Sequence, residues 1–304
     1  MFKIGLVDLD TSHPVAWTPK INAYEDMKVV AIYDSGDVNP RSYTEEFAQK
    51  NDVKIAGSLT ELAGMVDAVI LHGAEWDRHV ERATPFIEAG KPVLIDKPIV
   101  GKLRDAHRLL SLQQKHPDAL IMGGSSVRFA PEVAALKAEK ASYGHISCAF
   151  ASGPNDFFSY GIHTVEMFQG FFGAGVKSVR YLGSNGGELF QATYKSGPIV
   201  IFQLSAPGGG WFFTISTAKG VRTATIDNNK LYDAIIAQFH TMLVEKKAPL
   251  PLSDFLEATL IQLAALRARQ TGATVHLDDL GYDEGFDGAA YTATYRANKW
   301  KGKY

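Results

Sequence analysis

A short apolar strand that ends on a lysine is encoded by the run Gly90-Lys91-Pro92-Val93-Leu94-Ile95-Asp96-Lys97-Pro98-Ile99. Desolvating an ammonium group is costly, so a lysine at the end of a buried strand calls for a partner or a purpose. In such a setting Lys97 can assist proton transfer during oxidation of an alcohol. The alternative is an ordinary strand-end lysine whose side chain reaches out to water, and the residues of this run alone favour that alternative.

The chain around this run alternates short apolar stretches with longer amphipathic ones. This alternation predicts an α/β fold in which residues 1–122 form a Rossmann-type, doubly wound parallel sheet. Lys97 then lies at the carboxyl end of a parallel strand, where ligands of such sheets bind, and this position favours a functional lysine. The predicted strands are residues 3–7, 29–33, 68–71, 93–95 and 120–122, with helical patterns between them, such as 78–89, which Gly90 ends.

After residue 122 the pattern changes to strands separated by turn clusters such as Ser184-Asn185-Gly186-Gly187. It predicts an α+β domain over residues 123–304, with a largely antiparallel open sheet that serves substrate binding and oligomerisation. Three helices are expected, at residues 160–172, 230–246 and 253–271, the last with Ser253 as its N-cap and Gly272 as its terminator. The predicted strands are residues 144–152, 176–183, 188–195, 198–205, 211–218 and 221–226.

Composition limits the classes of function. The 304 residues are 46% hydrophobic and 21% charged, as in a globular protein of two domains. The formal charge of −2 gives no basic stripe and argues against nucleic acid as a partner. No apolar run approaches the ~20 residues that span a bilayer, which argues against a membrane protein. With no signal peptide after Met1, a cytoplasmic location is expected.

The single cysteine, Cys148, excludes an intramolecular disulfide and a cysteine-rich zinc site. It lies in an apolar stretch, so we expect it in the core rather than as a nucleophile.

The turn after the first strand reads Asp8-Leu9-Asp10-Thr11-Ser12-His13. Relative to the usual G-x-G-x-x-G, the three glycine positions are held by Asp8, Asp10 and His13. Two carboxylates repel a pyrophosphate unless they point away or hold a bridging cation. Thr11 and Ser12 can cap a helix and offer hydroxyl donors to a phosphate.

Asp34 ends the second strand, 24 residues beyond Asp10. A carboxylate at this place can bind the 2′-hydroxyl of an adenosine ribose and disfavours a 2′-phosphate, which indicates NAD rather than NADP. The alternative is a turn-forming aspartate before Ser35-Gly36.

His163 and Glu166 are three residues apart and share one face of a predicted helix. A histidine can act as acid or base near neutral pH, and a carboxylate can orient it. A surface pair or a core histidine with satisfied hydrogen bonds is the alternative. No third metal ligand is evident, so we predict no metal site. Serine-hydrolase chemistry is not supported, because no Gly-x-Ser-x-Gly elbow is present.

Taken together, these segments resemble the glucose-fructose oxidoreductase/inositol dehydrogenase family, written Gfo/Idh/MocA. Residues 66–98 resemble that family's D-A-V … H-x-x-x-A … A-G-K-x-V-x-x-E-K-P pattern, with Asp96 in place of the usual glutamate. Further similar segments are Arg128-Phe129-Ala130-Pro131, Tyr160-Gly161-Ile162-His163 and Gly272-Ala273-Thr274-Val275-His276-Leu277.

The resemblance implies an NAD(P)-dependent oxidoreductase that moves a hydride between nicotinamide and a hydroxyl of a sugar, cyclitol or related polyol. It implies that Lys97 orients the hydroxyl and assists proton transfer, and that His163 is the principal acid/base. The family's aspartate four residues before this histidine is Ser159 here. NAD is the expected cofactor, with NADP less favoured. The implied cofactor-binding residues are Asp8, Asp10, Thr11, Ser12, Asp34, His79 and Lys97, and the implied substrate-binding residues are Arg128, Ser159 and Tyr160.

Two other functions stay open at this level: a non-catalytic ligand-binding or regulatory member of the family, and an NAD-assisted lyase or glycosidase. A homo-oligomer, either dimer or tetramer, is expected if the large apolar residues of the second sheet face another subunit. The alternative is that these residues cover the domain's own helices. They are Phe202, Leu204, Trp211 and Phe213.

Overall fold

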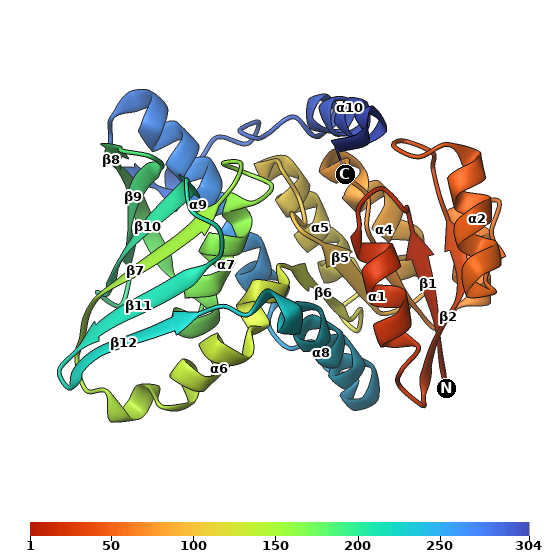
Figure 1. Cartoon of the computed structure of the whole chain (residues 1–304), viewed down its shortest axis with the longest axis horizontal. Coiled ribbons are helices and arrows are strands. Elements are labelled where there is room, and N and C mark those ends of the chain that lie inside the picture. The colour runs from red at the N-terminus through yellow and green to blue at the C-terminus, as the bar shows by residue number, and fades with distance from the viewer. Residues whose placement is uncertain (304) are drawn as a thin grey trace. The chain divides into compact units, whose positions relative to one another are not determined.

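The computed structural model describes residues Met1–Lys303 and divides them into two compact units (Figure 1). Unit 1 contains Met1–Gly123, Ile236–Leu252 and the residues from Asp287 onward, and unit 2 contains Gly124–Ile235 and Ser253–Phe286. The division expected from the sequence, 1–122 and 123–304, differs from these units because two later segments return to unit 1. Among the described residues no helix is both long and apolar enough to cross a bilayer.

Unit 1 is built on a six-stranded Rossmann sheet with the order β3-β2-β1-β4-β5-β6. β1 pairs in parallel with β2 on one side and with β4 on the other, so the strand order reverses between β1 and β4. Such a switch point is where doubly wound sheets bind ligands. The strands are β1 (Phe2–Val7), β2 (Met27–Tyr33), β3 (Lys54–Ile55), β4 (Ala68–Leu71), β5 (Val93–Asp96) and β6 (Ile121–Gly124).

The apolar runs of the sequence become strands because helices cover them. All residues of β4 and β5 are buried, as in a parallel sheet covered on both faces. α3 and α4 pack against each other and against strands β1, β2, β4 and β5, and α1 contacts β2. The helices of unit 1 are α1 (His13–Ile21), α2 (Arg41–Asn51), α3 (Leu59–Met65), α4 (His79–Glu88), α5 (Leu103–Lys115) and α10 (Gly288–Asn298), together with most of α8 (Leu231–Glu245).

Unit 2 contains a seven-stranded sheet with the order β12-β11-β7-β10-β9-β8-β13. β7 and β10 pair in parallel, and the other pairs are antiparallel. α7 packs against β7, β10 and α6. The strands are β7 (Ile146–Pro154), β8 (Val176–Ser184), β9 (Glu188–Tyr194), β10 (Ile199–Ala206), β11 (Phe212–Thr217), β12 (Gly220–Thr225) and β13 (Val275–His276), and the helices are α6 (Pro131–Ala138), α7 (Gly161–Phe172) and α9 (Leu252–Thr271).

The predicted fold class is confirmed: a parallel Rossmann sheet is followed by a mixed, mostly antiparallel sheet. Gly272 ends α9 with φ +70° as expected, whereas the helix begins at Leu252, one residue before the predicted cap Ser253. Cys148 is exposed on β7, so its predicted core position is wrong: the first residues of this strand, Ser147 and Cys148 among them, lie at the surface, and the strand becomes buried only further on.

The four large apolar residues of the second sheet are buried inside unit 2. Phe168 and Phe171 on α7 lie against Phe202 and Phe213, with ring centroids 5.5 Å apart in each pair. These side chains therefore cover the unit's own helix, which is the second of the two interpretations given for them.

Candidate functional site

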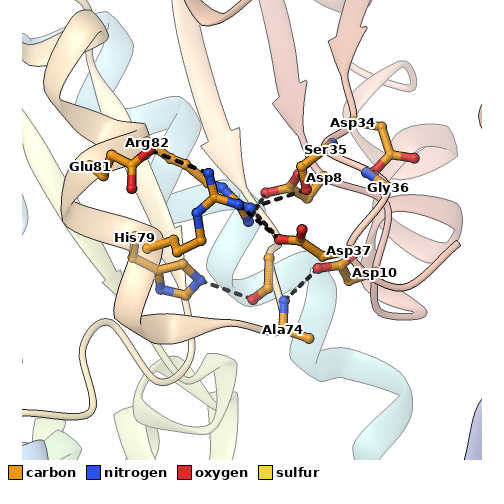
Figure 2. Close-up of polar contacts among 12 residues, drawn as sticks. Asp8, Asp10, Asp34, Ser35, Gly36, Asp37, Ala74, His79, Glu81 and Arg82 are labelled. Carbon is orange, nitrogen blue, oxygen red and sulfur yellow. Dashed lines mark hydrogen bonds and ion pairs between the residues drawn. The ribbon is translucent and has the colours of Figure 1, made fainter. Parts of the chain in front are cut away.

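Asp8 keeps the backbone conformation of the glycine that it replaces. Its φ is +65°, in the left-handed region that a first glycine of the phosphate turn can adopt without strain. Its carboxylate points away from the turn, toward α4 and the end of β2: it accepts hydrogen bonds from Arg82 Nη1 at 2.6 Å and from Ser35 Oγ at 2.8 Å (Figure 2). A guanidinium therefore compensates this negative charge. Asp8 therefore points away from the turn, which is one of the arrangements in which its carboxylate would not repel a pyrophosphate.

Asp10 is neutralised by a different route. Its Oδ2 accepts a hydrogen bond from Ala74 N at 2.8 Å (Figure 2), and its Oδ1 is buried with no hydrogen-bond partner among the described residues. Burial, reinforced by the charge of Asp8, raises the pKa of Asp10 to about 8. Burial also raises the pKa of Asp8, but the Arg82 guanidinium opposes that rise, whereas Asp10 has no ion-pair partner of its own.

Arg82 joins the turns that follow β1 and β2. Besides Asp8, its guanidinium contacts Ser35 Oγ at 3.1 Å and forms a short ion pair with Asp37 (Figure 2). Gly73, after β4, lies so close that an added Cβ would be 2.9 Å from Arg82 Nη1. Sequence reasoning missed Arg82 and Asp37. The available signal was a basic residue on the same helix face as the apolar Phe86, four residues further on.

Thr11 and Ser12 complete the turn at the N-terminus of α1. Thr11 Oγ1 accepts a hydrogen bond from His13 N at 3.2 Å, while the exposed Ser12 makes no capping hydrogen bond with its side chain. The backbone of this turn and both hydroxyls therefore lie where a phosphate would meet a helix N-terminus.

Asp34 lies at the end of β2 and points away from the Arg82 cluster (Figure 2). Its carboxylate accepts a hydrogen bond from Thr44 Oγ1 at 2.5 Å and a long one from Gly36 N at 3.4 Å. The carboxylate is thus fixed at the position expected for a ribose-binding acid, while its contact with Gly36 is also that of a turn-forming aspartate.

His79 is completely buried, with Nδ1 3.0 Å from Ile99 O and Nε2 2.9 Å from Gly73 O. Burial lowers the pKa of this imidazole. The ring therefore connects the turns after β4 and β5.

Lys97 follows the last residue of β5, where Asp96 organises a small cluster. Lys97 N donates to Asp96 Oδ1 at 2.7 Å, while Asp96 Oδ2 lies 2.5 Å from His13 Nδ1 and 3.0 Å from His72 Nδ1. Burial raises the pKa of Asp96, but the charge and hydrogen bonds of the two imidazoles outweigh it and hold that pKa well below its usual value. Asp96 is therefore an ionised carboxylate that accepts three N–H groups.

His13, His72 and Asp96 are also a donor set that can hold a divalent cation, because one ligand atom of each lies within 4.8 Å of the others. Burial lowers the pKa of His72, while its contact with Asp96 opposes that shift. Sequence reasoning did not bring these residues together, since 83 positions separate His13 from Asp96.

In unit 2, His163 lies in the first turn of α7. Its Nδ1 is 2.6 Å from Ser125 Oγ, and the rings of Tyr160 and Trp211 lie at centroid distances of 5.7 and 5.1 Å. The hydrogen bond to Ser125 fixes the orientation of the ring. Sequence reasoning missed Ser125, and nothing in its neighbourhood distinguished it.

Two buried polar groups near His163 have no hydrogen-bond partner within the described part of the chain: Trp211 Nε1 and Thr164 Oγ1. Both lie over Gly153, where an added Cβ would be 2.5 Å from Trp211 Nε1 and 2.2 Å from Thr164 Oγ1. Unsatisfied buried polar groups are rare in folded proteins.

Ser159 occupies the position of the family's aspartate and is buried. It donates from Oγ to Asp156 Oδ2 at 2.5 Å and from its backbone N to Asp156 Oδ1 at 2.6 Å. The carboxylate that the motif lacks therefore lies one hydrogen bond further away, at Asp156.

Arg128, expected at the substrate, is buried against α7. Its Nε donates to Glu166 Oε2 at 2.8 Å and its Nη2 donates to Gln169 Oε1 at 2.9 Å. Gly124 allows this approach, since an added Cβ there would be 2.3 Å from Glu166 Oε1. Glu166 is thus an ion-pair partner of Arg128, and the group that holds His163 Nδ1 is Ser125.

Comparisons with known proteins agree with this geometry. Residues 3–124 match the family model GFO_IDH_MocA, described as an oxidoreductase family with an NAD-binding Rossmann fold. This part of the chain is therefore similar to the NAD-binding domain of the Gfo/Idh/MocA oxidoreductases. Over 135 residues it is 28% identical to YceM of Salmonella typhimurium, a protein named as an oxidoreductase; the match spans 44% of this chain and 42% of that protein.

Solved structures share the fold across both units. Apo scyllo-inositol dehydrogenase from Lactobacillus casei has a TM-score of 0.80 at 14% identity, covering 92% of this chain and 99% of its own. The same enzyme with bound NAD(H) and scyllo-inositol gives 0.79, also at 14% identity, with 92% and 100% covered. A myo-inositol dehydrogenase from Corynebacterium glutamicum gives 0.77 at 19% identity, with 92% and 100% covered.

Proposed function

We propose that this protein is an NAD-dependent oxidoreductase that moves a hydride between nicotinamide and a hydroxyl of a sugar, cyclitol or related polyol. The observation that carries the proposal is the state of the two carboxyls in the phosphate turn. Asp8 has the backbone conformation of a glycine and an arginine partner, and burial keeps Asp10 protonated at neutral pH. A turn whose carboxyls are neutralised in this way fits a pyrophosphate.

The proposed chemistry assigns Lys97 to orient the reacting hydroxyl and His163 to take or give its proton. Nicotinamide, when bound, supplies the hydride acceptor. Oxidation breaks the O–H bond, whose proton passes to His163 Nε2, and the C–H bond, whose electron pair leaves with the hydride as C=O forms. Ser125 holds the ring through Nδ1, which supports this use of Nε2.

Polyol recognition is supported by the surroundings of His163. Tyr160 is 37% exposed, and its ring is parallel to that of Trp211. Aromatic faces beside hydrogen-bonding groups suit the alternating apolar and hydroxyl surfaces of a cyclitol. Tyr160 and Ser159 remain our proposed substrate contacts, whereas the engaged guanidinium of Arg128 supports a positioning role for that residue.

Calorimetric titration with NAD⁺ and NADP⁺, followed by assays of NADH formation with a panel of polyols that includes scyllo- and myo-inositol, tests the proposal. We expect saturable NAD⁺ binding and turnover with at least one polyol. Lys97→Met and His163→Asn should each lower kcat by about 10²–10⁴-fold, the range for a lost acid–base group. The matched control is His240→Asn, a histidine on α8 that contacts Asp26. Absence of saturable NAD⁺ binding would reject the proposal.

A non-catalytic role is the second candidate, and one observation favours it. Arg82, a cation beside the phosphate turn, forms ion pairs with Asp8 and Asp37. If this role is correct, Lys97→Met and His163→Asn leave ligand affinity unchanged and the panel gives no turnover. NAD that co-purifies without net consumption would instead indicate the lyase or glycosidase alternative.

A further inference from the structure

The segment Gly288–Trp300, formed by α10 and the residues after it, runs along the carboxyl ends of three adjacent strands of unit 1. α10 lies beyond the arrowhead of β1 (Figure 1). At its start, Gly288 N donates to Asp77 Oδ2 at 3.0 Å and the ring of Tyr291 packs on Trp76 at a centroid distance of 4.6 Å. Trp76 and Asp77 belong to the short helix that follows β4. This end of the segment is therefore anchored beside β4.

The other end of the segment contacts the turns after β1 and β2. Lys299 Nζ donates to Asp10 O at 2.8 Å, and Trp300 Nε1 donates to Val38 O at 2.9 Å. Arg296 Nη1 adds a longer contact with Asp37 O at 3.3 Å. The three donors come from more than 250 positions away in the chain, so these contacts are tertiary contacts made specifically by this segment.

These two turns are the ones that a doubly wound fold uses for the adenosine half of a dinucleotide. The pyrophosphate meets the turn after the first strand, and the ribose meets the acid that ends the second, here Asp34. Lys299 reaches this place from the opposite end of the sequence and also lies 5.2 Å from the centre of the Tyr43 ring on α2. The methylene chain and the ammonium group of Lys299 therefore lie beside both turns.

We propose that the 288–300 segment is a built-in cover of the adenosine edge, and that its 296–300 end leaves the turns after β1 and β2 before a dinucleotide binds. The inference rests on the proposed function, because it assumes that NAD is the ligand of this edge. A protein whose competent state is only partly populated binds its ligand with an affinity reduced by that fraction. The cover therefore lowers the affinity for NAD.

The contacts of the cover are suited to release at one end only. At the 296–300 end they are side-chain hydrogen bonds to main-chain carbonyls, and Trp300 is 54% exposed. At the Gly288 end, the backbone N of Gly288 donates to the Asp77 carboxylate and the Tyr291 ring packs on Trp76. Asp287 also caps α10 there by accepting a hydrogen bond from Ala290 N. Segments with few buried apolar contacts open most readily.

Titration calorimetry with NAD⁺ and ADP-ribose tests the proposal on the full chain, on Lys299→Ala, on Trp300→Ala and on the double variant. We expect the double variant to bind both probes about tenfold tighter, as for a site that is open one-tenth of the time in the wild type. Lys301→Ala is the matched control: it removes the same charge from an exposed position two residues further on, and it should bind like the wild type.

The outcomes separate the inference from the proposed function. If the wild type binds saturably and the double variant binds equally or more weakly, the proposed cover is rejected and the proposed function is unaffected. Saturable binding by both proteins, tighter in the double variant, supports both. No binding by either protein rejects both, since an opened edge would then have no affinity for a dinucleotide.

Amide hydrogen exchange of the wild type gives a second readout. Saturating NAD⁺ should speed exchange in residues 296–303 while slowing it in the turn of residues 8–13. Slower exchange in both regions would mean that the segment closes over the cofactor instead of leaving it, and would overturn the proposal.

Discussion

Oδ2 of Asp8 lies 2.6 Å from Nη1 of Arg82, and both side chains are shielded from solvent. Removing one partner of such a pair leaves an uncompensated buried charge. We expect Arg82→Met to lower the free energy of unfolding by about 3–5 kcal/mol, measured by urea unfolding of the full chain. Asp8→Asn combined with Arg82→Met should recover much of the loss. Arg78→Met, which removes a 38% exposed arginine from the same cluster, should cost under about 1 kcal/mol. Equal losses for the two arginines would contradict the buried-pair explanation.

The raised pKa of Asp10 makes stability depend on pH. Asp10 keeps its proton in the folded chain up to about pH 8, whereas an unfolded aspartate loses it near pH ~3.9. Between these values the folded state binds one more proton, so this contribution is fully present below about pH 4, falls as the pH rises toward 8 and is level above it. Asp10→Asn, whose side chain is neutral at every pH, should lack this pH-dependent contribution to stability.

The measurement is the difference in melting temperature between wild type and Asp10→Asn from pH 5 to pH 9. The difference isolates Asp10 from the other groups that titrate in this range. The melting temperature of Asp10→Asn should rise relative to that of the wild type as the pH increases. A constant difference would show that Asp10 is ionised in the folded chain.

Ser125 acts, in our proposal, by positioning His163 through the 2.6 Å contact with Nδ1. Ser125→Ala should lower kcat about tenfold to a hundredfold and shift the pH–rate profile, while Ser125→Thr keeps most of the activity. Ser126→Ala, which removes the neighbouring hydroxyl, is the control and should behave like the wild type. An unchanged pH–rate profile in Ser125→Ala, together with a lowered melting temperature, would indicate a purely structural serine.

Asp34 sets the expected preference for NAD over NADP. Asp34→Ser removes the negative charge that opposes a 2′-phosphate, so the ratio of the two dissociation constants should shift about tenfold toward NADP. Titration with both cofactors measures this. A ratio that does not move would identify Asp34 as the turn-forming aspartate that its bond to Gly36 N also allows.

The sequence predicted the fold well because its local signals agreed with its tertiary packing. Apolar runs such as residues 68–71 become buried strands, and Gly90 and Gly272 end α4 and α9 with positive φ angles. α10 was missed because its stretch, Gly288–Asn298, has only two buried residues and no apolar stripe.

Side-chain partners were harder to predict than strands. The reading of Asp8 and Asp10 as repulsive left out their neighbours, since Arg82 is 74 residues from Asp8 and Ala74 is 64 residues from Asp10. Likewise, the spacing of His163 and Glu166 correctly put them on one helix but gave no sign that Arg128 and Ser125 would contact them. Helical spacing reports which side chains share a face, whereas long-range partners depend on how the sheets assemble.

The chain passes between the two units at 123/124, 235/236, 252/253 and 286/287. A ribosome therefore releases the six strands of unit 1 early, yet that unit stays incomplete until α10 has been made. Domains usually fold as units during synthesis, the first one made folding first. Here the Rossmann sheet must hold its dinucleotide edge uncovered while about 160 further residues emerge, as follows from the interval between Gly124 and Asp287. A nascent chain thus passes through a stage in which the cofactor edge exists and its cover does not.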